Sequence, residues 1–147
     1  MNKKKLRGFT LIELIIVISV IAILLGIALP RLKGMIDEGN VAKAAGEIRA
    51  LQVGLESYYV HQGKKYPAAL ATLTSVTPKL INSIPTDPFG TSSYSYAVDG
   101  APAKFYVVWS VGIDGSGTLT ISTTGLVGGA GADDIYMSNG TPSSGGF

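Results

Sequence analysis

The stretch that decides the fold runs from Gly8 to Pro30 and reads GFTLIELIIVISVIAILLGIALP. From Phe9 to Leu29 almost every residue is apolar, and a helix of this length spans about 31 Å at about 1.5 Å per residue. That length matches the hydrocarbon thickness of a bilayer. An ordinary secretory signal has a shorter apolar core followed by small residues at a cleavage site, which is not the pattern here. We therefore predict a membrane-spanning helix.

Basic residues precede this helix, at Lys3, Lys4, Lys5 and Arg7. Such a cluster favours an N-terminus that stays in the cytoplasm while the rest of the chain crosses the membrane. These four are among twelve basic residues, which leaves eight basic against ten acidic residues elsewhere. A nucleic-acid-binding domain needs a basic face beyond such a leader, so we expect no nucleic-acid partner.

One acidic residue, Glu13, interrupts the apolar run near its start. A lone carboxylate in a membrane costs a few kcal/mol, about 3 on insertion scales, unless it has a partner or a neutral state. Two interpretations follow. Glu13 lies near enough to the interface to reach water, or it pairs with a cation on a neighbouring subunit. The second makes Glu13 a device that sets the register between subunits.

The junction around these residues reads KKLRGFTLIE over positions 4–13 and resembles the leader junction of type IV pilins and of the pseudopilins of type II secretion. The resemblance implies that a membrane prepilin peptidase cuts between Gly8 and Phe9 and methylates the new N-terminus at Phe9. The positive amine of Phe9 would then be neutralised by Glu13 of the preceding subunit. It also implies three regions: a cleaved leader over 1–8, a transmembrane and assembly helix over 9–30, and a periplasmic part over 31–147.

The helix is expected to continue beyond Pro30, which removes one helical hydrogen bond and either bends the helix or breaks it locally. Family helices carry a proline here, so the resemblance also assigns Pro30 a role in assembly. Apolar residues recur at helical spacing from Val41 to Tyr59, with polar residues between them. We predict one helix from Phe9 to about Tyr59 whose second half is amphipathic and packs on a small head. A coiled-coil zipper is the alternative, but the repeat is short and rich in glycine.

The rest of the chain predicts a small α+β head. A short helix is expected over 68–76, and strand signals occupy 93–98, 104–111 and 118–122. Three antiparallel strands against one amphipathic helix provide a sufficient core. The chain from Gly125 onward is rich in glycine, and we expect the segment 141–147 to be loose.

Motifs in the head narrow the resemblance to the major pseudopilins of type II secretion, whose fold is type IV pilin-like. They occur in the order seen in that family: Tyr66-Pro67, Asp87-Pro88-Phe89-Gly90, Tyr94-Ser95-Tyr96 and the run Val108–Gly115. The absence of cysteine agrees, since many Gram-negative pilins close a C-terminal loop with a disulfide.

The resemblance also implies a structural calcium ion in the loops after the last long strand. Calcium takes six to eight oxygen ligands, commonly carboxylates and backbone carbonyls. Asp114 matches a family aspartate, Val111 matches a carbonyl donor, and Asp134 matches the closing motif. The chain departs from that motif, since Ala132 replaces its first aspartate and Asp133 lies one position away. The alternative is that Asp114 only makes a turn and that Asp133 and Asp134 are solvated.

No nucleophile–base pair, phosphate-binding motif or metal triad is recognisable, so we expect no enzymatic activity. The leading hypothesis is a pseudopilus subunit that acts by polymerisation. Its implied partners are further copies of itself, prepilin peptidase, inner-membrane assembly machinery, minor pseudopilins and, before assembly, membrane lipid. We expect a single-pass inner-membrane protein with a periplasmic head, and then a periplasmic or extracellular filament. A surface type IV pilin for adhesion or motility and a non-polymerising, membrane-anchored binding protein remain as alternatives.

Overall fold

The computed structural model describes residues 8–101, 103–129, 131 and 133–142, in two compact units, Met1–Asp37 and Glu38–Phe147. Three predictions fall outside the described residues. They concern the basic leader up to Arg7, the position of Ala132, and the part of the C-terminal segment beyond Pro142.

Helix α1 extends from Leu11 to His61, two residues later at each end than predicted. Its helical conformation continues through Pro30, so the local break that the missing N–H permits is not present. In the first unit the apolar side chains are exposed, with Phe9 at 85% and Ile36 at 62%. Within the described residues α1 is the one helix long and apolar enough to cross a membrane.

The second unit is organised around the C-terminal half of α1, which buries Ala44, Ile48, Leu51 and Leu55. Their spacing of three and four residues places them on one face of the helix. This face packs in one cluster with residues of the head, among them Leu73 of the short helix α2, Thr72–Ser75. The predicted amphipathic stripe is confirmed, and because it contacts its own head it does not form a zipper.

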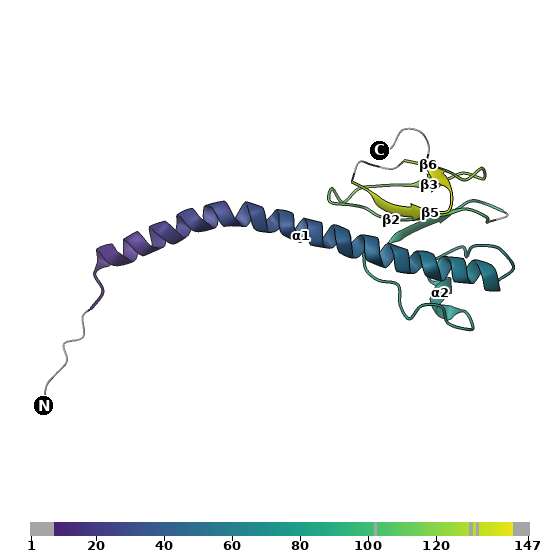
Figure 1. Ribbon diagram of the computed structural model, residues 1–147, viewed down its shortest axis with the longest axis horizontal. Coiled ribbons are helices and arrows are strands. Elements are labelled where there is room, and N and C mark those ends of the chain that lie inside the picture. The colour runs from purple at the N-terminus through teal and green to yellow at the C-terminus, as the bar shows by residue number, and fades with distance from the viewer. Residues whose placement is uncertain (1–7, 102, 130, 132, 143–147) are drawn as a thin grey trace, which may run out of the picture. The chain divides into compact units, whose positions relative to one another are not determined.

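Within the described residues of the head, six short strands form two sheets. Figure 1 shows them beside the C-terminal half of α1. The first is antiparallel and has the order β1-β2-β5, with β1 at Ser95–Val98, β2 at Tyr106–Ser110 and β5 at Ile135–Ser138. The second has the order β3-β4-β6, formed by Thr120–Ile121, Leu126–Gly128 and Thr141–Pro142. The α+β architecture is confirmed, and the start of the segment expected to be loose is paired with β4.

The third strand of the first sheet was predicted wrongly. The segment 118–122 provides β3 of the second sheet, and β5 occupies the edge beside β2, with Met137 opposite Val108. The reason lies in β2, whose five residues are all buried. A strand covered on both faces needs a second apolar layer, so the chain after β2 crosses to the other face.

The two faces of β2 belong to separate clusters. Tyr106 and Val108 pack in the cluster that contains α1, whereas Val107 and Trp109 pack with Leu119 and Val127. The alternation along β2 places successive side chains on opposite faces of the sheet. The head therefore has three layers: helix, first sheet and second sheet.

Candidate assembly and processing site

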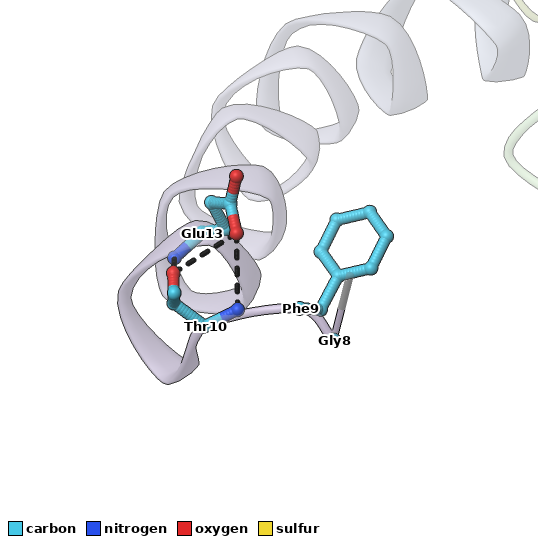
Figure 2. A pocket seen from close by; sticks show the side chains of 4 residues that line it. All are labelled: Gly8, Phe9, Thr10 and Glu13. Atoms are coloured by element: carbon cyan, nitrogen blue, oxygen red, sulfur yellow. Dashed lines mark hydrogen bonds between the residues drawn. The ribbon is translucent and has the colours of Figure 1, made fainter. Parts of the chain in front are cut away.

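The N-terminal end of α1 is closed by a reciprocal pair, Thr10 and Glu13 (Figure 2). Glu13 Oε2 accepts hydrogen bonds from the Thr10 backbone N–H and from the Thr10 hydroxyl, both at 3.0 Å. The Glu13 backbone N–H donates to the Thr10 hydroxyl at 3.3 Å. This is a capping box, in which a Thr–x–x–Glu sequence satisfies donors that the first turn of a helix leaves free.

From the sequence, we predicted that Glu13 either reaches water or pairs with a cation on a neighbouring subunit. Thr10 was not among the predicted partners. The structure adds a third partner, the first turn of the protein's own helix. The signal was present in the spacing of a threonine and a glutamate at positions 10 and 13. Both bonds from Thr10 use Oε2, and the described residues supply no hydrogen-bond partner for Oε1. The capping box as described therefore uses only one of the two oxygens of Glu13.

Gly8 and Phe9 lie beside this cap, and the four residues line one open pocket (Figure 2). Gly8 is exposed, and no atom of the described residues lies within 4 Å of where a side chain would begin at this position. The structure thus brings three of the predicted residues, Gly8, Phe9 and Glu13, to one accessible place. Pro30 follows Glu13 by about five helical turns and is not part of this pocket.

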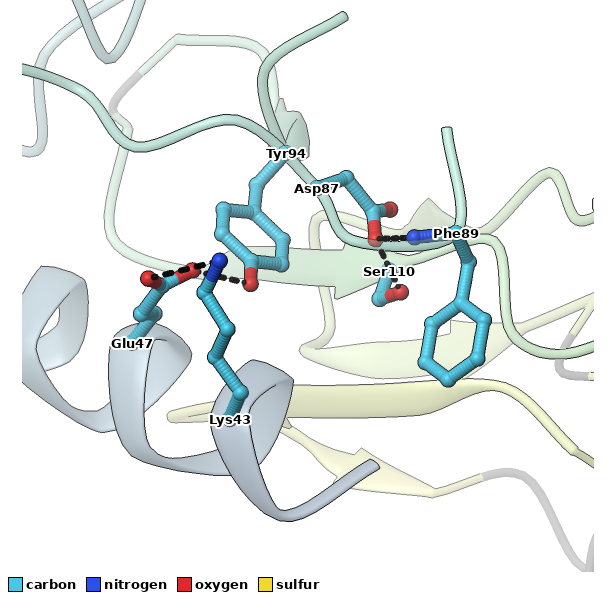
Figure 3. Close-up of polar contacts among 6 residues, drawn as sticks. All are labelled: Lys43, Glu47, Asp87, Phe89, Tyr94 and Ser110. Atoms are coloured by element: carbon cyan, nitrogen blue, oxygen red, sulfur yellow. Dashed lines mark hydrogen bonds and ion pairs between the residues drawn. The ribbon is translucent and has the colours of Figure 1, made fainter. Parts of the chain in front are cut away.

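In the head, two half-buried glutamates of α1 act as acceptors for tyrosine hydroxyls. Glu56 accepts from Tyr66 at 3.0 Å and from Tyr106 at 3.0 Å. Glu47 accepts from Tyr94 at 2.6 Å and lies 3.9 Å from the ammonium of Lys43 (Figure 3). These contacts tie the helix to the loops and to β2.

These tyrosines are held in their neutral form. Burial raises the pKa of Tyr66, and the nearby carboxylate of Glu56 raises this pKa further. Burial and Glu47 raise the pKa of Tyr94 in the same way. The rings of Tyr66 and Tyr106 lie 4.5 Å apart. A buried hydroxyl that donates to a carboxylate is a structural contact, and its raised pKa makes it a poor acid.

The Asp87-Pro88-Phe89-Gly90 motif is explained by the buried carboxylate of Asp87, which is 4% exposed. Asp87 Oδ1 accepts from the hydroxyl of Ser110 at 2.7 Å and from the N–H of Phe89 at 3.0 Å (Figure 3). Its Oδ2 accepts from the N–H of Val111 at 3.1 Å. Asp87 thus joins the loop before β1 to the end of β2, a role that the sequence did not reveal.

The predicted calcium residues lie in two neighbouring loops, and one carboxylate oxygen of each aspartate accepts a backbone N–H. Asp133 Oδ2 accepts from the N–H of Asp114 at 2.9 Å, and Asp114 Oδ1 accepts from the N–H of Ser116 at 2.8 Å. Gly112 has a φ of +70° and packs so closely on Asp133 that a side chain at this position would collide with it. These bonds fit the turn-forming alternative for Asp114.

Asp134 is different, because its Oδ2 accepts from the N–H of Gly131 at 2.6 Å while its buried Oδ1 has no hydrogen-bond partner among the described residues. An orphaned carboxylate oxygen is what a cation would satisfy. However, nowhere in the described residues do three histidine, cysteine or acidic side chains converge as a metal site. Side chains alone therefore do not build the site, and a calcium ion would depend on carbonyls such as that of Val111.

Two family profiles match the chain. The profile "Prokaryotic N-terminal methylation motif" matches residues 3–29, and "Type II secretion system (T2SS), protein G" matches residues 31–123. The first covers the N-terminal part of α1, which carries Glu13, and the second covers the rest of α1 and most of the head. No solved structure matches the chain.

Individual relatives agree with the profiles. Type II secretion system core protein G of Pseudomonas aeruginosa is 27% identical over 129 residues, covering 78% of this chain and 89% of that protein. The core protein G of Pectobacterium carotovorum subsp. carotovorum is 31% identical over 123 residues, covering 74% and 77%. A fimbrial protein of Pseudomonas aeruginosa is 38% identical, but only over 76 residues, or 52% of this chain and 45% of that protein. The match to the head as well as the helix shows that the chain belongs to the type II secretion system protein G family.

Proposed function

We propose that this protein is a structural subunit that polymerises through its N-terminal helix into the pseudopilus of type II secretion. The observation that carries the proposal is the apolar segment of the first unit, from Phe9 to Ile36, which stays exposed in the single chain. So large an apolar surface needs cover from lipid or from other chains. Lipid provides it before assembly, and the helices of other copies provide it afterwards.

The pocket at Gly8, Phe9 and Glu13 supports processing by a prepilin peptidase, with cleavage before Phe9 and methylation of its amine. Both described residues of the junction, Gly8 and Phe9, are exposed, as a cleavage site requires. The free oxygen of Glu13 is suited to receive the amine of a neighbouring subunit, because an ammonium group and a carboxylate in an apolar setting stabilise each other. The basic leader supports a cytoplasmic N-terminus and a periplasmic head.

The comparison of the head favours a pseudopilus over a surface pilus. The alignment with the fimbrial relative covers 52% of the chain, whereas the protein G profile matches residues 31–123, which include most of the head. A membrane-anchored binding protein that never polymerises would need Glu13 only as a cap of its own helix, a role for which Oε2 alone is enough. A pseudopilus subunit of type II secretion is therefore favoured over a surface pilin and over a membrane-anchored binding protein. Its role is structural rather than catalytic.

Mass spectrometry of the chain extracted from membranes tests the proposal. We expect a mature N-terminus at Phe9 with one added methyl group, and sheared filaments built from this species. A matched control is Gly8→Val, which should leave the leader attached and prevent filaments. Any other N-terminus in the wild-type chain would contradict the processing step, and a methylated chain that never leaves the membrane would contradict polymerisation.

Calcium binding remains a prediction of the sequence. The orphaned oxygen of Asp134 supports it, while the bonds of Asp114 and Asp133 to the backbone support simple turns. If bound, the ion would hold together the loops around Val111 and Asp134 by coordinating oxygens from both.

A further inference from the structure

The outward face of α1 in the head carries an exposed patch that is both apolar and basic. Val53 is 70% exposed and Val60 is 73% exposed, while Gly46 and Arg49 are exposed on the same side. Positions 46, 49, 53 and 60 follow helical spacing and therefore share one face. No atom of the described residues lies within 4 Å of the site where Gly46 would carry a side chain. We call these four residues the helix patch.

Arg49 gives the helix patch its charge. The one ion pair within the described residues joins Lys43 to Glu47, so Arg49 faces solvent without an ion-pair partner in that part of the chain. Arg49 lies between Gly46 and Val53 in the helix patch. A partner for this face should therefore offer an apolar side chain next to a carboxylate.

Among the described residues of the head, the loop after β2 offers that combination. Ile113 is 55% exposed, and Asp114 is exposed beside it in the loop after β2. The hydrogen bond from the Asp114 N–H to Asp133 holds this loop in place. We call Ile113 and Asp114 the loop patch. Leu126 is another exposed apolar residue of the head, but threonine and glycine precede it and it lacks an adjacent acid.

We propose that the helix patch of one copy binds the loop patch of the next copy, with Ile113 against Val53 and Asp114 paired with Arg49. The two patches belong to different elements, so every copy offers one of each. Such a head-to-tail contact leaves an unused patch at both ends and produces an open chain, whereas a two-fold contact would stop at a dimer. The inference rests on the proposed function, because it names a contact between heads within the filament.

Cysteine cross-linking in the full-length chain tests the contact directly, because the natural sequence contains no cysteine. The variant Val53→Cys/Ile113→Cys is produced together with the assembly machinery, and its filaments are oxidised. We expect a ladder of disulfide-linked multimers. Each single variant should give no ladder beyond a dimer, and Lys79→Cys/Ile113→Cys, which pairs the loop with another exposed position, should give none.

Charge reversal tests the ion pair. Arg49→Glu should reduce the yield of sheared filaments about fivefold, as expected for the loss of an exposed pair worth about 1 kcal/mol. Combining Arg49→Glu with Asp114→Arg should restore at least half of the yield, which a purely structural defect at either position would not do.

The outcomes separate this contact from the proposed function. Normal filaments with methylated Phe9, no ladder from the Val53/Ile113 pair and no loss from Arg49→Glu would overturn the contact and leave the pseudopilus subunit intact. A Val53 cross-link to a different protein would also overturn it. A wild-type chain that forms no filaments would overturn both.

Discussion

Glu13 and Thr10 satisfy each other at the start of α1, with Oε2 of Glu13 accepting from the Thr10 N–H and hydroxyl, both at 3.0 Å. A carboxylate near the membrane is thereby partly satisfied before any neighbour arrives, which lowers the cost of inserting it. The same pair aligns Glu13 against the end of the helix where the backbone dipole favours negative charge. In the single chain, the carboxylate of Glu13 is therefore held in a defined position, and its Oε1 has no hydrogen-bond partner in the described residues.

Replacing Thr10 by valine should weaken assembly. The substitution keeps the shape but removes the hydroxyl, at a cost of about 1 kcal/mol for a lost helix cap. We expect a lower yield of sheared filaments at an unchanged level of membrane-inserted chain. Thr10→Ser is the matched control, because serine keeps the oxygen, and it should assemble like the wild type. Equal yields from Thr10→Val and Thr10→Ser would show that the hydroxyl has no part in assembly.

Replacing Glu13 by alanine should have a stronger effect on assembly and none on insertion. In the proposed pairing, the amine of Phe9 in a neighbouring subunit would lose its counter-charge, and the helix would lose its cap as well. We expect the processed chain to accumulate in the membrane, as measured by fractionation, with filaments strongly reduced. Glu13→Asp keeps the charge on a shorter side chain and should fall between alanine and the wild type. A normal filament yield from Glu13→Ala would contradict the role of Glu13 as a register device.

The local features of this protein could be predicted from the sequence, because they depend on neighbours in the chain. Helix α1 was recognised from its apolar run and its later periodicity, and Gly8, Phe9 and Glu13 fall within one short motif. The interpretation of Glu13 was nevertheless incomplete. It considered the free-energy cost of a carboxylate in a membrane and overlooked the Thr10–Glu13 spacing that forms a helix cap.

Features that depend on distant contacts were missed. Asp87 accepts a hydrogen bond from Ser110, which lies 23 residues later in the sequence, and no local sequence pattern predicts this pairing. Strand β5 lies in a glycine-rich region without an alternating pattern, so it was not predicted. Segment 118–122 was predicted instead as the third strand of the first sheet. The apolar run of β2 did contain a signal, because five buried residues in succession require cover on both faces of the sheet.

Removing the acceptor at Glu56 should destabilise the head. Glu56→Ala leaves the hydroxyls of Tyr66 and Tyr106 without this partner in a largely buried setting, and each unsatisfied group costs about 1–3 kcal/mol. We expect a lower urea midpoint for the full chain in detergent, followed by tyrosine fluorescence or near-ultraviolet circular dichroism. Glu56→Gln keeps one acceptor oxygen and should be less damaging. An unchanged midpoint in Glu56→Ala would mean that water replaces the carboxylate without cost.

Alkaline pH should destabilise the head through the same tyrosines. The folded state raises the pKa of Tyr66 above the ordinary value of 10.0, so its stabilising effect is complete below that pH. Above pH 10 the unfolded chain loses the proton while the folded chain keeps it, and the free energy of unfolding falls as pH rises towards the folded pKa. Urea midpoints at about pH 8 and about pH 11 measure the change. Tyr66→Phe is expected to be less stable but to show a shallower decline between these two values, and an identical decline would contradict the assignment.

Calcium should stabilise the head if the oxygen of Asp134 is a ligand. At a hundredfold excess over Kd, a ligand that binds only the folded state adds about 2.7 kcal/mol, which should raise the melting temperature of the full chain by several degrees. A chelator should reverse the shift, and magnesium should not replace calcium, because it demands a smaller and more regular shell of oxygens. Asp134→Asn should abolish the response, whereas Glu38→Gln, an exposed acid on α1 outside the loops, should retain it. A melting temperature of the wild-type chain that ignores both calcium and chelator would assign Asp114 and Asp133 to turns alone, and would leave the orphaned oxygen of Asp134 to a water molecule.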